Sequence, residues 1–140
     1  MKNKNPLTNI FKILSGFLII LLPVNHSVGN NWPAWRGADA TGSITGKNYP
    51  SELNLNKNLI WKSPLPGKGC STPIVWEDSI LLTCPVNGKD TVLSFSMSGS
   101  KKWETEIGPE QKGRHLNGSG SNPSVTTDGK NLYALFKSGN

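Results

Sequence analysis

Charged residues are scarce in this chain: Asp, Glu, Lys and Arg make up only 17% of its 140 residues. Hydrophobic residues are also few, at 35%, whereas Gly and Pro are abundant, with 15 and 10 copies. Because Gly and Pro are the residues least suited to a helix interior, the composition disfavours a helical bundle or a coiled coil. Glycine does not recur at every third position, and Trp, Val and Ile form clusters, so collagen and low-complexity disorder are disfavoured as well. The composition indicates a turn-rich chain.

Residues that bind metals or carry redox chemistry are few. Cys70 and Cys84 are the only cysteines, and their spacing is not the Cys-x-x-Cys of redox and metal sites. His115 is the only His after residue 29, and one His cannot form a metal site. The acidic residues are scattered: Asp39, Glu52, Glu77, Asp78, Asp90, Glu104, Glu106, Glu110 and Asp128. With no nucleophile elbow either, we assign no catalytic, cofactor-binding or metal-ligating residue.

The first 29 residues have the three parts of a secretory signal peptide. Residues 1–12 carry three Lys and no acid, residues 13–24 (ILSGFLIILLPV) are uncharged and mostly apolar, and Ser27 and Gly29 form a small-x-small cleavage pattern. We expect cleavage before Asn30 and a periplasmic or secreted product. The alternative is an uncleaved anchor, although a spanning helix needs about 20 apolar residues. No Cys lies near the cleavage point, so a lipid-anchored lipoprotein is not expected.

Much of the positive charge belongs to this segment. The formal net charge is +6, from 15 basic and 9 acidic residues. Three basic residues and no acidic residue precede residue 30, which leaves 12 basic and 9 acidic residues and a net charge of +3. Only Lys101 and Lys102 are adjacent among the remaining basic residues. Because a nucleic-acid groove needs a basic stripe with interleaved aromatic residues, no nucleic-acid partner is expected.

Apolar runs alternate with turn clusters after residue 57, and residues 30–57 are predicted to be a loop segment. The predicted strands are residues 58–62, 72–76, 80–84, 91–97, 102–107, 125–127 and 132–136. Residues 91–97 (TVLSFSM) alternate apolar and polar residues, which is typical of a half-buried strand. No stretch after residue 29 has the i, i+3, i+4 apolar spacing of a convincing helix.

Part of this region is repeated. Residues 71–75 (STPIV) match residues 121–125 (SNPSV), with prolines 50 residues apart, and a turn containing an Asp follows each copy. Trp61 and Trp103 each close a strand series and are 42 residues apart. The two spacings agree if residues 108–120 (GPEQKGRHLNGSG) contain an insertion of eight residues. A period of about 40–50 residues with about four short strands is typical of β-propeller blades, which stack to bury their faces.

Three segments resemble the pyrroloquinoline-quinone-like (PQQ-like) β-propeller repeat proteins of bacteria: residues 31–37 (NWPAWRG), 65–75 (LPGKGCSTPIV) and 94–103 (SFSMSGSKKW). The resemblance implies an all-β fold of four-stranded antiparallel blades. Residues 58–140 would hold one full blade and parts of two others, hence an incomplete ring, and we expect an amino-terminal fragment or a truncated gene product. The family usually has Leu-Asp where this chain has Phe95-Ser96, so the Asp that braces the following turn is absent.

The resemblance implies less about activity. We expect an exported, non-catalytic binding or scaffold module with no cofactor, an unknown protein or small-molecule partner and self-association through open sheet edges. The alternative is the N-terminal part of a PQQ-dependent dehydrogenase, an oxidoreductase of the quinoprotein class. Such family members hold PQQ and Ca²⁺ with side chains from several blades, and those positions cannot be located in this chain. A third interpretation is a carbohydrate-contacting surface built on Trp32, Trp35 and Trp76.

The sequence leaves the state of the two cysteines open. Simple hairpin register places Cys84 opposite Thr72, two residues from Cys70, so both a disulfide and two separate thiols are compatible with the sequence.

His115, with Arg114 and Asn117, could line a ligand site in the loop of residues 108–120, because loops between blades often carry function. The simpler interpretation is a solvated loop, since no partner residue is identifiable.

Overall fold

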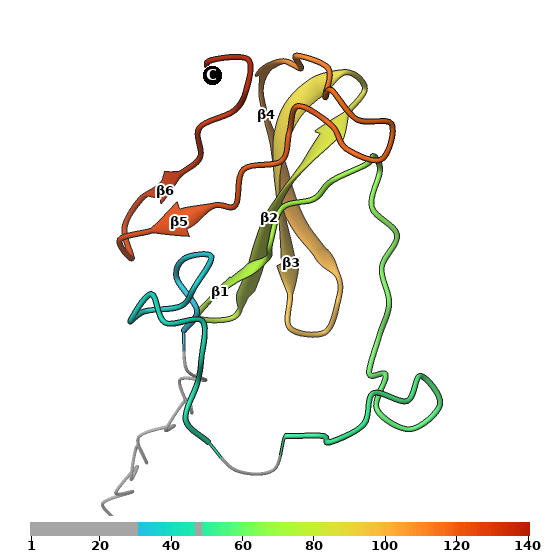
Figure 1. The fold of residues 1–140 in the computed structure, drawn as a ribbon, viewed down its shortest axis with the longest axis vertical. Helices are drawn as coiled ribbons and strands as arrows, with labels where there is room; N and C mark the ends of the chain where they lie inside the picture. The colour runs from blue at the N-terminus through green and yellow to red at the C-terminus, as the bar shows by residue number, and fades with distance from the viewer. Residues whose placement is uncertain (1–30, 47–48) are drawn as a thin grey trace, which may run out of the picture.

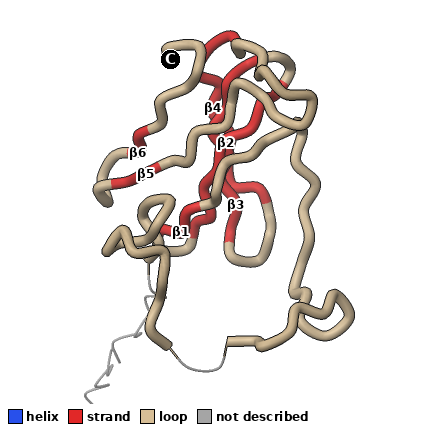
Figure 2. The backbone as a smooth tube through the Cα atoms, viewed as in Figure 1, coloured by secondary structure: helices blue, strands red, loops and turns tan. Residues whose placement is uncertain are grey.

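The computed structural model describes residues 31–46 and 49–140. The expected signal peptide and its cleavage point lie outside the described residues. The strands form one four-stranded and one two-stranded sheet. Figure 1 shows that the larger sheet is twisted, that the smaller sheet lies beside it and that long loops connect the strands. Figure 2 shows that the described residues form strands and loops and no helix. The chain is therefore all-β in its described part.

The larger sheet is an antiparallel meander whose strands neighbour one another in chain order. Its strands are β1 (Ile74–Trp76), β2 (Ser79–Val86), β3 (Lys89–Ser96) and β4 (Lys101–Pro109). The smaller sheet pairs β5 (Thr126–Thr127) with β6 (Leu132–Tyr133). Six of the seven strands predicted from the sequence are confirmed, with β5 and β6 shorter than expected.

Turn residues explain where these strands end. Asn87 and Gly88 both have positive φ angles, at 51° and 75°, as a two-residue hairpin turn between β2 and β3 requires. Between β3 and β4, Gly99 has a φ of 87° and donates its N–H to the Ser96 carbonyl at 2.9 Å. The Ser96 hydroxyl accepts a hydrogen bond from the Ser100 N–H at 3.2 Å. Ser96 stands where the family that the sequence resembles usually has an Asp. Its hydroxyl therefore braces this turn in place of that carboxylate.

The strand predicted at residues 58–62 is not formed. Residues 59–62 make no backbone hydrogen bond to any other described residue, and a strand exists only when its backbone pairs with a neighbour. Trp61 is held by its side chain instead, because its indole Nε1 donates to the Met97 carbonyl at 2.8 Å. The composition of this segment favours a strand, but no described strand pairs with it.

The two faces of the larger sheet are covered by different parts of the chain. One face, which we call the hairpin face, carries Ile74, Leu81 and Val92. These residues pack against Val125 and Phe136, which flank the β5–β6 hairpin. The opposite side, the loop face, carries a second apolar cluster: Leu82, Cys84, Leu93 and Phe95. Residues 63–66 lie against the loop face beside Leu93 and Phe95.

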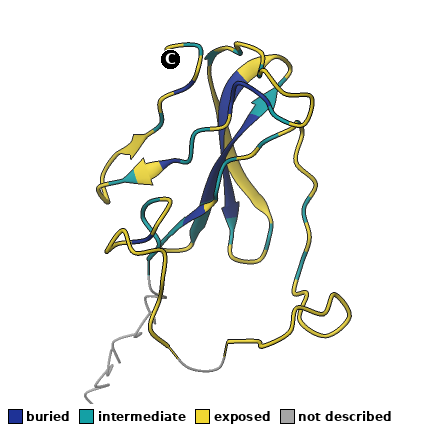
Figure 3. Cartoon of the chain, viewed as in Figure 1, coloured by how far each residue is buried: buried dark blue, intermediate teal, exposed yellow. Residues whose placement is uncertain are grey.

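This double coverage corrects the prediction for residues 91–97. The alternation predicted a strand buried on one face, but Thr91, Ser94 and the apolar residues between them are all buried, as the dark central strands in Figure 3 show. Residues from far along the chain cover the polar face, which a local pattern cannot reveal. The edge strand β4 is mostly exposed.

Candidate functional site

Several loops meet at one end of the larger sheet, at the top of Figure 1. We call residues 67–70, 108–121 and 137–140 the loop cluster. Lys68 Nζ donates to the Leu116 carbonyl at 2.8 Å, and Lys137 Nζ donates to the Lys112 carbonyl at 2.6 Å. The loop cluster includes residues 108–120, where the repeat spacing predicts the insertion.

Asp90 of β3 is the buried acid beneath this loop cluster. Its side chain is fully buried and accepts a hydrogen bond from the Ser121 hydroxyl at 2.5 Å. The Ser138 hydroxyl and the Asn140 amide, the latter at 3.3 Å, donate to its other oxygen. Neutral donors thus engage both carboxylate oxygens, and no cation pairs with Asp90 among the described residues. This geometry suits a structural anchor better than a general base, which must have an oxygen free to receive a proton.

The two copies of the repeated Ser-x-Pro motif converge on Thr83 of β2. The Ser71 hydroxyl bonds to the backbone of Thr83, donating to its carbonyl at 2.9 Å and accepting from its N–H at 3.1 Å. From the second copy, the carbonyls of Ser121 and Pro123 accept hydrogen bonds from the Thr83 hydroxyl at 3.1 and 2.7 Å. The copies also touch each other, since the Thr72 N–H donates to the Ser124 hydroxyl at 2.9 Å.

Sequence reasoning did not single out Asp90, Thr83 or Ser121 as contact residues. A usable signal was the repeat itself, because Ser71 and Ser121 occupy the same position in its two copies. Both serines contact the larger sheet, one through the backbone of β2 and the other through Asp90 of β3.

The His115 loop does not assemble a set of reactive side chains. His115 is exposed, and its carbonyl accepts a hydrogen bond from the Gly118 N–H at 3.1 Å. Neither the Arg114 nor the His115 side chain has a hydrogen-bond or ion-pair partner within residues 31–46 and 49–140. The contact that reaches Asn117 goes to its backbone, where the Cys70 thiol lies 3.8 Å from the carbonyl oxygen.

Cys70 and Cys84 are both free thiols. The observed register pairs Ile74 with Leu81, one residue away from the prediction, and Cys84 faces Thr91 of β3. Thr72 precedes β1 and lies outside this pairing, so the predicted placement of Cys84 opposite Thr72 is wrong. The buried Cys84 thiol donates to the Gly67 carbonyl at 3.2 Å, and burial raises its pKa. A raised pKa keeps the thiol protonated and makes it a poor nucleophile.

The three Trp side chains considered for carbohydrate contact are not equally accessible to a ligand. A Cβ added to Gly37 would lie 3.0 Å from the Trp32 ring, and one added to Gly129 would lie 2.8 Å from the Trp76 ring. Trp32 and Trp76 therefore pack closely on glycines of nearby turns. Trp35 is 65% exposed. One exposed indole is a small surface for stacking a sugar.

A groove lies between residues 63–66 and the larger sheet. It has a volume of about 380 Å³, and its other wall is formed by Leu93, Phe95, Lys101 and Glu104. Lys101 and Glu104 form an ion pair at 2.7 Å at its polar side. An apolar wall with a few polar groups is the usual composition of a small-molecule site.

Two turns carry acids with a lowered pKa. The N–H groups of Asn131 and Lys130 and the Tyr133 hydroxyl donate to Asp128, at 2.7, 2.8 and 2.8 Å, and hold the pKa of its carboxyl well below the usual range. The hydrogen bond from the Tyr133 hydroxyl to Asp128 also raises the pKa of Tyr133. Lys102, 2.8 Å away, lowers the pKa of Asp78. Each of these contacts is an ordinary turn or edge interaction.

Within the described ranges, no three His, Cys, Asp or Glu side chains are grouped as a metal site would require. The same part of the chain contains no helix of the length and apolarity that crossing a membrane takes. No protein-family model matches the chain, and neither a curated protein nor a solved structure is significantly similar to it.

Proposed function

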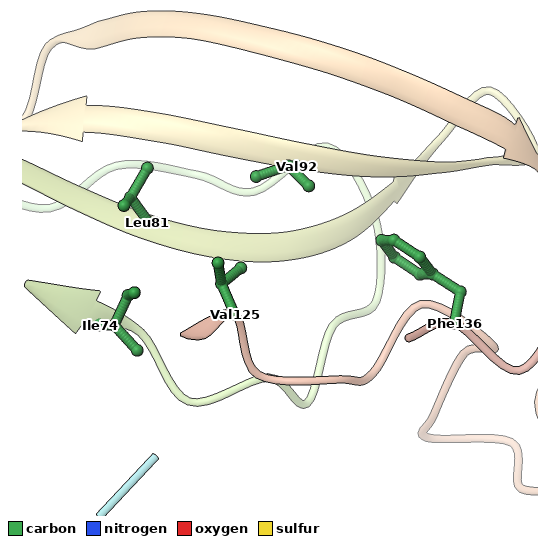
Figure 4. Packing of buried hydrophobic residues seen from close by; sticks show 5 residues of the cluster. All are labelled: Ile74, Leu81, Val92, Val125 and Phe136. Carbon is green, nitrogen blue, oxygen red and sulfur yellow. The ribbon is translucent and has the colours of Figure 1, made fainter. Parts of the chain in front are cut away.

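We propose that the chain is an exported PQQ-like β-propeller repeat segment that acts as a non-catalytic binding or scaffold module. The observation that carries the proposal is the packing of the β5–β6 hairpin region against the hairpin face of the larger sheet. In Figure 4, Val125 and Phe136 lie on the side of β2 and β3 that carries Leu81 and Val92. Face-to-face stacking of successive small sheets is the arrangement that a propeller repeats around its axis.

The repeated sequence supports the same interpretation. The two copies of the Ser-x-Pro motif run into β1 and β5, and they are in direct contact through Thr72 and Ser124. β1–β2 and β5–β6 would then be the first hairpins of two successive blades. The β3–β4 hairpin would complete the first blade.

The internal use of polar side chains supports a scaffold role over a catalytic one. The Asp90 carboxylate is engaged by Ser121, Ser138 and Asn140, and the Thr83 hydroxyl is engaged by two carbonyls. These groups join the larger sheet to the segments that precede β5 and follow β6. The groove of residues 63–66 is where we propose that a small ligand or a peptide side chain binds.

Hydrogen exchange tests the stacked-sheet proposal. If β5–β6 and the larger sheet form one cooperative unit, amides of Leu93 in β3 and of Tyr133 in β6, which pairs with Thr126, exchange with the same opening free energy in mild denaturant. Exchange of Tyr133 at a much lower opening free energy would show that the hairpin is an independent appendage, and the blade interpretation would be lost.

A cofactor assay separates the scaffold proposal from the dehydrogenase alternative. The purified full chain is incubated with PQQ and Ca²⁺, desalted, and examined for quinone absorbance and dye-linked alcohol oxidation. We expect neither signal. Retained absorbance together with alcohol oxidation would replace the proposal by the dehydrogenase alternative.

Export is tested by fractionation and N-terminal sequencing. When the full chain is expressed in a Gram-negative host, we expect it in the periplasm or medium with Asn30 as its first residue. Recovery in the membrane fraction with Met1 retained would instead support the uncleaved anchor.

A further inference from the structure

We propose that the loop of residues 112–118 binds reversibly to an anionic phospholipid surface, with Leu116 entering the interface and the cations around it contacting head-group phosphates. This surface is distinct from the groove of residues 63–66, and the inference does not depend on the propeller proposal. It uses neither a sheet face nor a sheet edge, because the loop belongs to the loop cluster at the end of the larger sheet (Figure 1).

The two ends of this loop are held together at its base. The Gly120 N–H donates to the Glu110 carboxylate at 2.9 Å. A Cβ added to Gly113 would lie 2.9 Å from the Ser119 backbone, so glycine permits the close approach of the two ends. Ser119 and Gly120 are both buried. Compact surface loops whose ends lie close together are frequently functional, and here the closed base presents the tip to solvent.

Leu116 stands at the tip. The Gly118 N–H donates to the His115 carbonyl at 3.1 Å, which closes a turn with Leu116 and Asn117 at its corners. The Leu116 residue is 90% exposed. A single exposed Leu is ordinary on a protein surface, so its exposure gains meaning only from the charges beside it.

Cations surround this exposed side chain. Lys68 Nζ donates to the carbonyl of Leu116 itself at 2.8 Å, and Arg114 lies two residues before it. Lys137 Nζ donates to the Lys112 carbonyl at 2.6 Å, which brings a further pair of cations to the start of the loop. All four basic residues are exposed. The three ion pairs of the described residues all involve β4, so none of them neutralises these cations.

The fold therefore gathers charge that is spread thinly along the sequence. The loop cluster contains four basic residues and one acidic residue, Glu110, which gives a net charge of +3. That value equals the net charge of the whole chain after residue 29, where 12 basic and 9 acidic residues occur. Asp90 lies beneath the loop cluster but is fully buried. The end of the sheet is thus a positively charged surface with an apolar tip.

A phospholipid surface fits this combination better than a soluble polyanion does. The loop cluster contains no Trp, Tyr or Phe on which bases could stack, as single-stranded nucleic acids require. A soluble polyanion would engage the cations and leave Leu116 in water. A bilayer interface engages both, because anionic head groups attract Lys and Arg while apolar side chains enter the boundary of the acyl chains. One Leu and a few cations give a reversible contact and no permanent anchor.

Hydrogen exchange of the full chain with vesicles tests this assignment at the loop itself. The vesicles contain phosphatidylglycerol and phosphatidylcholine in equal parts, and pure phosphatidylcholine vesicles are the reference without net charge. The readout is the lipid concentration that half-maximally slows amide exchange in residues 112–118. Because this readout is local, lipid contact of the apolar residues 13–24 does not mimic it. We expect slowing with the anionic vesicles only, and weaker slowing at high salt.

Two variants and two matched controls separate the charge from the apolar contact. Arg114→Glu changes the charge by two units and should raise the half-maximal lipid concentration about 25-fold, since each charge near an anionic surface contributes about fivefold. Leu116→Ser should raise it about tenfold through lost apolar burial. Lys57→Glu and Leu53→Ser change an exposed Lys and a 91% exposed Leu outside the loop cluster, and both should match the parent.

Three outcomes would overturn the proposal. The first is the absence of local slowing with anionic vesicles, and the second is an equal shift in variants and controls. The third is stronger slowing by dextran sulfate or duplex DNA than by vesicles, with no loss in Leu116→Ser, because the surface would then serve a soluble polyanion. Far-ultraviolet circular dichroism of every variant, matching the parent, shows that the fold is retained.

Discussion

The first hairpin, β1–β2, and the second, β5–β6, begin with the same Ser-x-Pro motif but differ in what surrounds them. β2 extends over eight residues and lies between β1 and β3, with residues covering both of its faces. β6 has two residues, one neighbouring strand and mostly exposed side chains. The comparison teaches that the motif and its turn specify a hairpin, whereas strand length and burial depend on neighbouring strands. Four substitutions test it, in order of decreasing expected effect.

Leu93→Ala should be the most destabilising change. Leu93 is buried at the centre of the loop-face cluster, and removing a buried Leu side chain leaves a cavity that costs about 3–4 kcal/mol in the free energy of unfolding. Urea denaturation followed by Trp fluorescence measures it. The matched control is Leu132→Ala in β6, where a half-exposed side chain should cost less than about 1 kcal/mol. Similar losses for both variants would contradict the difference in burial between the larger sheet and the β5–β6 hairpin.

Phe136→Ala tests whether the β5–β6 hairpin contributes to the stability of the β1–β2 hairpin. Phe136 is buried against the cluster of Ile74, Leu81 and Val92, so its truncation should cost about 3 kcal/mol of global stability. Leu135→Ala, at the exposed neighbouring position, is the control and should have little effect. If Phe136→Ala accelerates amide exchange only in residues 126–133, the hairpin is energetically separate from the larger sheet.

Asp90→Ala removes the buried acid that ties β3 to the loop cluster. The buried Ser121 hydroxyl and the half-buried Ser138 hydroxyl would lose their acceptor, and leaving a buried donor unpaired costs about 2 kcal/mol. The exposed Asp39→Ala is the control, with an expected change within about 0.5 kcal/mol. Amide exchange near Ser121 and Ser138 should also accelerate in Asp90→Ala. Unchanged exchange there would show that the anchor is not needed to hold these segments.

Asp128→Asn should have the smallest effect, and the effect should depend on pH. The pKa of Asp128 is lower in the folded chain than in the unfolded chain, so its ionised form stabilises the fold. That contribution is complete above the unfolded pKa of about 3.9 and disappears as the pH falls towards the folded pKa. Thermal melts should show a Tm about 1–3 °C lower for Asp128→Asn at pH 7. A difference that persists unchanged at pH 2 would mean that the carboxylate charge is not its cause.

Much of the secondary structure follows from local sequence. The Asn87-Gly88 turn and the Ser98-Gly99 turn stand between apolar runs, so the β2–β3 and β3–β4 hairpins were predictable with small errors in their ends. The register of β1 and β2 was missed by one residue, because a turn near Asp78 permits more than one alignment. The Leu59-Ile60-Trp61-Lys62 segment was predicted as a strand because propensity does not reveal whether a partner edge is within reach.

The contacts of the candidate site were beyond local reasoning for the same reason. Asp90 meets Ser121 and Ser138, which lie 31 and 48 residues further along the chain. Cys84 was a candidate for pairing with Cys70, yet the structure gives it the Gly67 carbonyl and a position facing Thr91. Contacts of this kind arise only when separate segments fold against one another.

The abundance of Gly and Pro and the spacing of the apolar runs determined by themselves that the described chain is all-β, built of short hairpins joined by turns. Turn chemistry and period-two alternation act between neighbouring residues, so they can be read without knowing the fold. Only the tertiary structure decided which faces are buried and which edges are capped. Burial and edge pairing depend on segments that are dozens of residues away, and Pro33 against β5 and Phe136 against β2 and β3 are two such cases.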